Sequence, residues 1–159
     1  MNSRHMTLKE QVAWLRQVKR VMPDNIRAAL EDLSESEKGA AEMIFEIVAN
    51  TPSGIIPGKD NRVWTGQMQM SGDSLVAGSG GHVHFEFGWL RADPEGYISI
   101  QEHGGFLPAL GNAEEVDGEI YVTPMNALEQ IARLYLQDGV LWDYIERAIK
   151  AGWAGKHYG

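Results

Sequence analysis

Three side chains that can bind a metal ion occupy alternate positions in one stretch of the chain. His82, His84 and Glu86 are spaced two residues apart, and a strand would therefore present all three on one face. Two imidazoles and a carboxylate are common ligands of zinc, iron and manganese, and His103 would supply a fourth. The solvent-exposed face of a half-buried strand has the same alternating pattern. We favour that interpretation over a metal-dependent enzyme.

No other motif indicates catalysis. The chain contains no cysteine, which excludes disulfides, thiolate metal ligands and cysteine nucleophiles. Gly78-Ser79-Gly80 lacks the Gly-x-Ser-x-Gly pattern of a nucleophile elbow. The glycine run that continues to Gly81 lacks the lysine and hydroxyl of a phosphate-binding loop, and a tight turn explains it better. We therefore predict no catalytic residue, no cofactor and no resident metal.

Length and charge limit the classes of partner. The 159 residues suffice for one domain with a substantial core. A net charge of −8 and a pI of about 5.1 argue against binding nucleic acid or anionic membrane through a basic surface. No apolar run has the length of a signal-peptide core or a membrane span. We expect one soluble intracellular domain whose acidic surface repels DNA.

Helical periodicity dominates the first part of the chain, residues 7–50. Thr7 and Glu10 have the spacing of a capping box, which predicts a helix start. Pro23 is expected to end this helix because it lacks an N–H and clashes with the preceding turn. Between them, apolar residues recur every three or four positions on one face: Leu8, Val12, Leu15, Val18 and Met22.

Two shorter apolar stripes follow Pro23. The first contains Ile26, Leu30 and Leu33. Residues 34–37 alternate serine with glutamate and are expected to cap a further helix, since hydroxyl and acidic side chains favour a helix N-terminus. The apolar face of that further helix contains Ala40, Ala41, Ile44, Phe45, Ile47 and Val48.

Residues 53–122 are rich in glycine and predict a small antiparallel sheet with a glycine-broken hairpin. A strand is expected over 74–77 and a turn over 78–81. The second strand is the clearest in the chain, because apolar residues alternate with polar residues or glycine and would point into the core: Val83, Phe85, Phe87 and Trp89.

The rest of this middle part predicts one short helix and one short strand. Residues 97–101 favour one or two helical turns that end at Gly104, where glycine can adopt the left-handed conformation. Residues 106–118 are expected to form a loop, and residues 119–122 a strand.

Residues 123–152 predict a long C-terminal helix. Thr123-Pro124 is typical of a helix start, because proline is favoured at the first helical position. Gly139 is expected to interrupt the helix, and residues 153–159 to form a weakly specified tail. The succession of helices, short strands and a final helix indicates an α+β fold in a single domain, residues 1–159.

Two regions are candidates for contact with partners. Residues 54–62 predict an exposed loop, and its tip contains Lys59, Asp60, Asn61 and Arg62. Trp64 and Trp153 lie beside a loop and a chain end, where tryptophan often forms binding hot spots. Trp14 and Trp142 fit the core-facing side of a helix better.

Short motifs follow one another in a recognisable order between Thr65 and Ile131. They are Trp64-Thr65-Gly66-Gln67-Met68, a hairpin over 75–89, Tyr97-Ile98-Ser99-Ile100-Gln101-Glu102-His103-Gly104, and Thr123-Pro124-Met125 ahead of an amphipathic helix. This order resembles the tail-completion, or minor tail-component, family of long-tailed double-stranded-DNA bacteriophages. The resemblance covers under half of the chain.

The resemblance implies a structural role without catalysis. Proteins of this family form rings, typically hexameric, between the head connector and the tail tube, and duplex DNA passes through the ring. The chain would then bind copies of itself and the neighbouring head-connector and tail-tube or tail-terminator proteins. It would assemble in the host cytoplasm and reside in the neck or tail of the virion, with no membrane partner.

The motif residues have expected structural roles. Gly66 and Gly104 would adopt backbone conformations closed to other residues. Trp89 and Tyr97 would anchor the hairpin to the short helix, and Trp89 is also a candidate for contact with a partner.

Glu102 and the loop over 55–62 are expected to make contacts beyond their own elements. Glu102 would lie at the C-terminal end of the short helix, where the helix dipole disfavours a negative charge. It should therefore be paired, either with Arg91 or with a neighbouring subunit. The loop would reach a neighbouring ring.

Other functions remain open from the sequence. The chain is also compatible with a tail terminator that caps the tail tube. An enzyme would use His82, His84 and Glu86 to hold a metal. An adaptor or antitoxin-like domain would form no ring.

Overall fold

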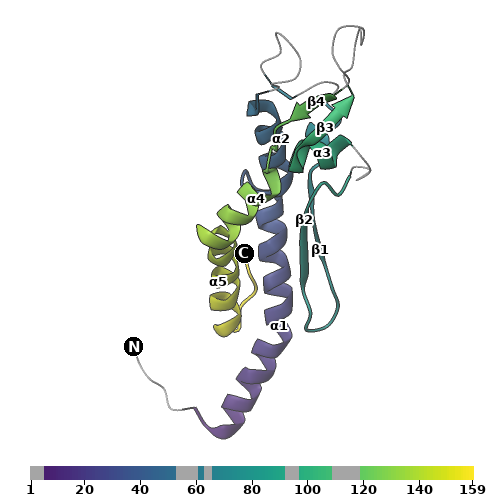
Figure 1. Cartoon of the computed structure of the whole chain (residues 1–159). Coiled ribbons are helices and arrows are strands. Elements are labelled where there is room, and N and C mark those ends of the chain that lie inside the picture. Colours follow the sequence, from purple (N-terminus) through teal and green to yellow (C-terminus); the bar gives the residue numbers. More distant parts are fainter. Residues whose placement is uncertain (1–5, 53–60, 63–65, 92–96, 109–118) are drawn as a thin grey trace.

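The computed structural model describes residues 6–52, 61–62, 66–91, 97–108 and 119–159, and it has the expected α+β arrangement. Figure 1 shows an elongated molecule in which the long helix α1 lies between helix α5 on one side and the β1–β2 hairpin on the other. The elements, in chain order, are α1 (Leu8–Glu35), α2 (Ala40–Asn50), η1 (Gln69–Ser71), β1 (Asp73–Ala77), β2 (His84–Gly88), α3 (Tyr97–His103), β3 (Gly105–Pro108), β4 (Glu119–Val122), α4 (Ala127–Ala132), η2 (Arg133–Gln137) and α5 (Val140–Trp153).

Helix α1 starts where the capping box predicts. The Thr7 side chain accepts a hydrogen bond from the Glu10 backbone N–H at 3.3 Å, and the Glu10 carboxylate accepts one from the Thr7 N–H at 2.7 Å. The Thr7 N–H bond, together with the Thr7 hydroxyl that donates to the same carboxylate at 2.9 Å, stabilises the ionised form and holds the pKa of Glu10 below its usual value. The capping box is therefore confirmed.

The expected helix end at Pro23 is wrong, because α1 continues through it to Glu35. A proline inside a helix costs about 3 kcal/mol. Packing on both sides of Pro23 offsets this cost, since Val21 and Ala29 are both buried. The two apolar stripes assigned to separate helices therefore belong to one helix. In Figure 1 its purple N-terminal part runs at an angle to the rest, as expected where proline interrupts the hydrogen-bond ladder.

Helix α5 and the chain end after it lie along α1. Asn25 is fully buried between them, and its side-chain amide donates to the Lys156 carbonyl at 2.8 Å. Its carbonyl oxygen accepts from the Tyr158 N–H at 2.9 Å. The Tyr158 hydroxyl also donates to the Asp32 carboxylate at 2.6 Å. The expectation of a weakly specified tail is therefore wrong, because a buried polar side chain of α1 fixes it.

Helix α2 confirms its predicted apolar face, but its predicted cap is wrong. Residues 34 and 35 belong to the last turn of α1, and Gly39 is the N-cap of α2. Serine at position 34 instead donates to the Leu30 carbonyl one turn back. Ala40, Ile44 and Val48 on the predicted face are completely buried.

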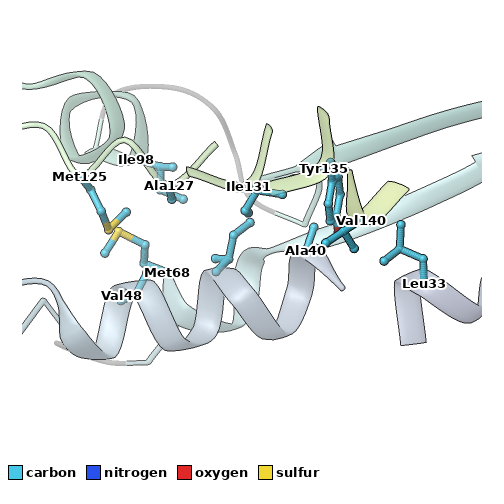
Figure 2. Packing of buried hydrophobic residues seen from close by; sticks show 11 residues of the cluster. Leu33, Ala40, Val48, Met68, Ile98, Met125, Ala127, Ile131, Tyr135 and Val140 are labelled. Atoms are coloured by element: carbon cyan, nitrogen blue, oxygen red, sulfur yellow. The ribbon is translucent and has the colours of Figure 1, made fainter. Parts of the chain in front are cut away.

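The main core lies between α2 and the α4–η2 segment (Figure 2). Tyr135 is its largest buried side chain, and its hydroxyl donates to the Lys38 carbonyl at 2.8 Å. The rings of Phe85 and Phe87 reach it from β2, with centroid distances of 6.1 and 5.2 Å. This contact confirms that the apolar positions of the β2 strand point inward.

The strands form two separate antiparallel pairs. β1 pairs with β2 so that Val76 lies opposite Phe85, which matches the predicted strands and turn. β3 pairs with β4 so that Gly105 lies opposite Val122. The loop expected over 106–118 is therefore wrong at its start, because residues 106–108 belong to β3. Alternation is too short there to signal a strand.

The C-terminal helical part begins later than Thr123-Pro124 predicts. Helix α4 starts at Ala127, after Asn126 in a left-handed conformation. The Met125 N–H donates to the Gln101 carbonyl at 2.8 Å instead of continuing a helix. Gly139 interrupts the helical run as expected, with a φ of 79° between η2 and α5. None of the helices in the described part of the chain has the length and hydrophobicity needed to cross a bilayer.

Gly72→Ala tests the contact between the start of β1 and α2. An added Cβ would lie 2.7 Å from side-chain atoms of Ile44, which is completely buried. We expect urea unfolding to show a loss of about 1–3 kcal/mol, as for other overpacked cores. Gly81→Ala is the matched control, because its Cβ would meet nothing within 4 Å. Equal stability of the two variants would contradict this packing.

Tyr135 should make stability pH-dependent at high pH. Burial, with a smaller effect of Tyr144, raises the pKa of Tyr135 to about 12, against about 10 in an unfolded chain. The folded state therefore holds this proton more tightly. Its contribution is complete below about pH 10 and is lost as the pH rises to about 12.

The Tyr135→Phe variant should lack this loss and be about 1 kcal/mol less stable at neutral pH, because it cannot bond to Lys38. Both proteins should carry Tyr158→Phe, since the pKa of Tyr158 is also raised to about 12. Urea unfolding at pH 8 to 11.5 measures the difference. Parallel pH profiles would show that Tyr135 is not buried as described.

Candidate functional site

The histidine-rich face of β2 does not assemble as a metal site in the described residues. His84 Nε2 lies 2.6 Å from Glu86 Oε1, and both side chains are exposed. No group of three or more histidine, aspartate or glutamate side chains converges in the part of the chain that the structure describes. The arrangement therefore gives no support to the metal-dependent enzyme.

Four of the twelve predicted interface and motif residues lie outside the described residues. These are Lys59, Asp60, Trp64 and Thr65. Asn61 is half-buried. Arg62 was expected at an exposed loop tip, and that expectation is wrong, because its side chain is buried.

Arg62 joins three segments that are distant in the sequence. Its Nη1 donates to the side-chain oxygen of Gln101 at 3.1 Å and to that residue's carbonyl at 3.2 Å. Its Nη2 donates to the Thr123 carbonyl at 2.7 Å, and its Nε to the Pro52 carbonyl at 3.2 Å. The planar guanidinium suits such divergent acceptors. Arg62 thus connects the end of α2, helix α3 and the segment after β4.

Glu102 is paired, but not with Arg91. It is buried near the end of α3, and one carboxylate oxygen accepts from the Leu128 backbone N–H at 2.7 Å. The other accepts from Trp89 Nε1 at 3.3 Å. Arg91 instead bonds to Asp73 at 2.8 Å. Glu102 therefore satisfies an N–H in the first turn of α4, where the helix dipole favours a negative charge.

The other motif residues have the structural roles expected where they are described. The Trp89 bond to Glu102 confirms that this tryptophan anchors the hairpin to α3. Gly66 and Gly104 have φ values of 79° and 80°, in the region that favours glycine. At Gly104 a Cβ would also lie 3.0 Å from the Pro124 ring. Tyr97 begins α3, but its side chain is not among the parts that the structure describes.

Trp153 is exposed, and its role as an interface residue stays a prediction. Its ring packs at 5.1 Å from that of Trp14, and its carbonyl accepts from Trp14 Nε1 at 3.1 Å. Trp14 was assigned to the core, and it is half-buried by this contact. Trp142 was also assigned to the core. That assignment is wrong, because 58% of the residue is exposed.

Sequence analysis missed a larger exposed apolar surface at the start of α1. Leu8 is 77% exposed and Leu15 is 51% exposed, although both lie on a predicted core face. Val12 between them is exposed as well. The periodicity identified the face correctly, but it gives no information on whether another element covers it.

Charge is segregated along the molecule. Residues 8–20 contain four basic side chains and one carboxylate, whereas residues 31–46 contain six carboxylates and one lysine. The first group lies on the purple end of α1 in Figure 1, and the second runs from the end of α1 onto α2, toward the opposite end of the molecule. The molecule therefore has a basic end and an acidic end with complementary charge.

Comparison with protein-family models, with curated proteins and with solved structures finds no match to this chain. Inferences about function therefore depend on the geometry and charge described above and on the motif resemblance.

Arg62→Lys tests whether the guanidinium fork holds the three segments together. A lysine keeps the charge, but its three N–H groups share one nitrogen and cannot reproduce bonds that start from Nε, Nη1 and Nη2 of the guanidinium. We expect a loss of about 2 kcal/mol on urea unfolding, as for buried charge-assisted hydrogen bonds. Arg91→Lys, at a partly exposed ion pair with Asp73, should cost less than about 1 kcal/mol. Similar costs for the two variants would contradict the proposed bridging role.

Proposed function

We propose that the protein is a structural subunit of a phage neck or tail, a tail-completion or head–tail connector protein. It assembles as a homo-oligomeric ring around the DNA channel, between the head connector and the tail tube. The motif order given above is the first support for this proposal. The segregation of charge along the molecule is the second and carries most of the weight.

A subunit with two different complementary ends favours head-to-tail assembly. Like ends repel and unlike ends attract, so identical copies bind through two distinct surfaces. Such heterologous contacts generate a ring when the rotation between subunits closes. The basic end of α1 and the acidic α2 region provide these two surfaces. A symmetric dimer in which two like ends meet would instead bring like charges together.

The overall charge suits a channel that DNA slides through. With −8 on 159 residues, a ring would present mostly negative surface, which does not hold phosphates. DNA passage then requires no sequence-specific contact. The basic part of α1 is consumed in contacts between subunits under this arrangement, so it does not face the channel.

Strand edges offer a further means of contact. In the described residues each sheet has two strands, so each strand has one edge without a strand partner. Unpaired N–H and C=O groups can accept a strand from a neighbouring protein. This suits a protein that stacks between rings of other proteins. The same features also suit a tail terminator, which differs only in the partner that it caps.

Negative-stain electron microscopy tests the ring. We expect the purified protein, alone or mixed with virions or tail tubes, to form rings with a central hole wide enough for duplex DNA. Bound rings should appear at the neck. Rings that cap one end of isolated tail tubes would identify the terminator role instead. Small particles that never associate with tubes or virions would contradict the proposed function.

A further inference from the structure

The start of α1 carries a face that no described part of its own chain covers. Leu8, Val12 and Leu15 lie on the same side of the helix as Ile26 and Leu33, which are eleven or more residues further on. Over the second half of α1 this side is covered, since Leu33 belongs to the buried core cluster and Ile26 is partly buried. Over the first half Leu8, Val12 and Leu15 are exposed.

The length of the hairpin explains why this face stays open. The hairpin turn lies beside the central part of α1, where the Arg27 guanidinium donates to the Gly78 carbonyl at 2.8 Å. Leu15 lies twelve residues before Arg27, which is about 18 Å along a helix. On the other side, α5 ends beside Trp14. The first turns of α1 therefore project beyond both neighbours, as Figure 1 shows.

Basic residues flank this apolar face. Lys9 and Arg16 lie along one border of the face, and Lys19 lies on the face one turn further along the helix. All three side chains are exposed. We define the basic stripe as Leu8, Lys9, Val12, Leu15 and Arg16. Its occupant must provide apolar contact together with negative charge.

A surface of that kind lies on α2 and η1 near the other end of the molecule. Glu42, Phe45 and Glu46 share one exposed side of α2, being three and four positions apart. Phe45 is 36% exposed, and Met70 of the adjoining η1 is 61% exposed. The Gln69 side chain donates to the Phe45 carbonyl at 3.2 Å, which places η1 against this part of α2. We define the acidic patch as Glu42, Phe45, Glu46 and Met70.

We propose that the basic stripe of one copy docks on the acidic patch of a second copy. The leucines and Val12 cover Phe45 and Met70, and Lys9 and Arg16 pair with Glu42 and Glu46. The stripe and the patch are far apart in one chain, so the contact forms between chains and repeats head to tail. This inference rests on the proposed function and identifies the surfaces that close the ring.

Site-directed cross-linking tests this contact, because the chain has no cysteine of its own. Leu15→Cys and Phe45→Cys proteins are mixed and treated with a short bismaleimide. We expect a covalent dimer to form about tenfold faster than in either protein alone, since docked groups react at millimolar effective concentration. Ser79→Cys, at the exposed hairpin turn, is the matched control partner for Leu15→Cys and should give only background.

A chain with both Leu15→Cys and Phe45→Cys should give a ladder that stops at the number of subunits in the ring. Leu15→Cys alone cross-linking as fast as the mixture would show symmetric pairing of two stripes and overturn the proposal. A mixture that reacts no faster than the Ser79→Cys control would also overturn it. Thermal unfolding of each variant verifies that these exposed substitutions leave the fold intact.

Charge exchange provides an independent test. Lys9→Glu with Arg16→Glu should abolish association in sedimentation experiments, and so should Glu42→Lys with Glu46→Lys. Mixing the two variants should restore association, because each contact then joins opposite charges again. A mixture that stays monomeric while the wild-type protein associates would overturn the pairing.

Lipid and DNA are the competing occupants of a basic apolar helix face. We test these occupants by flotation with phosphatidylglycerol vesicles and by gel shift of duplex DNA. We expect the wild-type protein and the variant with Leu8→Ser and Leu15→Ser to behave alike in both assays, with no binding that depends on the stripe. Wild-type binding that this variant loses would assign the stripe to a different partner.

Rings that form although Leu15→Cys and Phe45→Cys do not cross-link would refute this contact alone. Cross-linked ladders that never associate with virions or tail tubes would refute the proposed function alone.

Discussion

The continuity of α1 through Pro23 is the constraint on which the rest of the structure depends. Because the helix does not end there, α5 can pack along its central part and the β1–β2 hairpin can lie on its other side. Buried contacts on both sides of the proline, such as Val21 and Asn25, offset the cost of the missing hydrogen bond. Continuity also carries the first turns of α1 beyond α5 and the hairpin. The exposed basic stripe is a direct consequence.

Two buried polar side chains connect the small elements to the core around α2. Arg62 joins the end of α2 to Gln101 and Thr123. Glu102, next to Gln101, satisfies the start of α4 and the Trp89 indole. Buried polar groups of this kind must be fully bonded to be stable, and each fixes the relative position of short elements that have little apolar surface of their own.

The sequence predicts the candidate interface only in part. The periodicity placed Leu8, Val12 and Leu15 on one helix face, because a period near 3.6 marks such a face in any amphipathic helix. It could not show that the face stays open, since that depends on where the hairpin and α5 end. Arg62 illustrates the reverse error. A charged residue beside glycine and proline predicts an exposed loop, yet its hydrogen-bond partners lie ten to sixty-one positions away in the sequence.

The sequence by itself determined the local features: the Thr7 capping box, the alternating faces of β2, the left-handed Gly104 and the interruption at Gly139. Each depends on residues within a few positions of one another, so propensity and spacing are sufficient to predict it. The tertiary structure decided whether a proline ends a helix, whether the tail is fixed, and which apolar and charged side chains remain on the surface. Those outcomes depend on the free energy of packing against segments distant in the chain, which no local pattern contains.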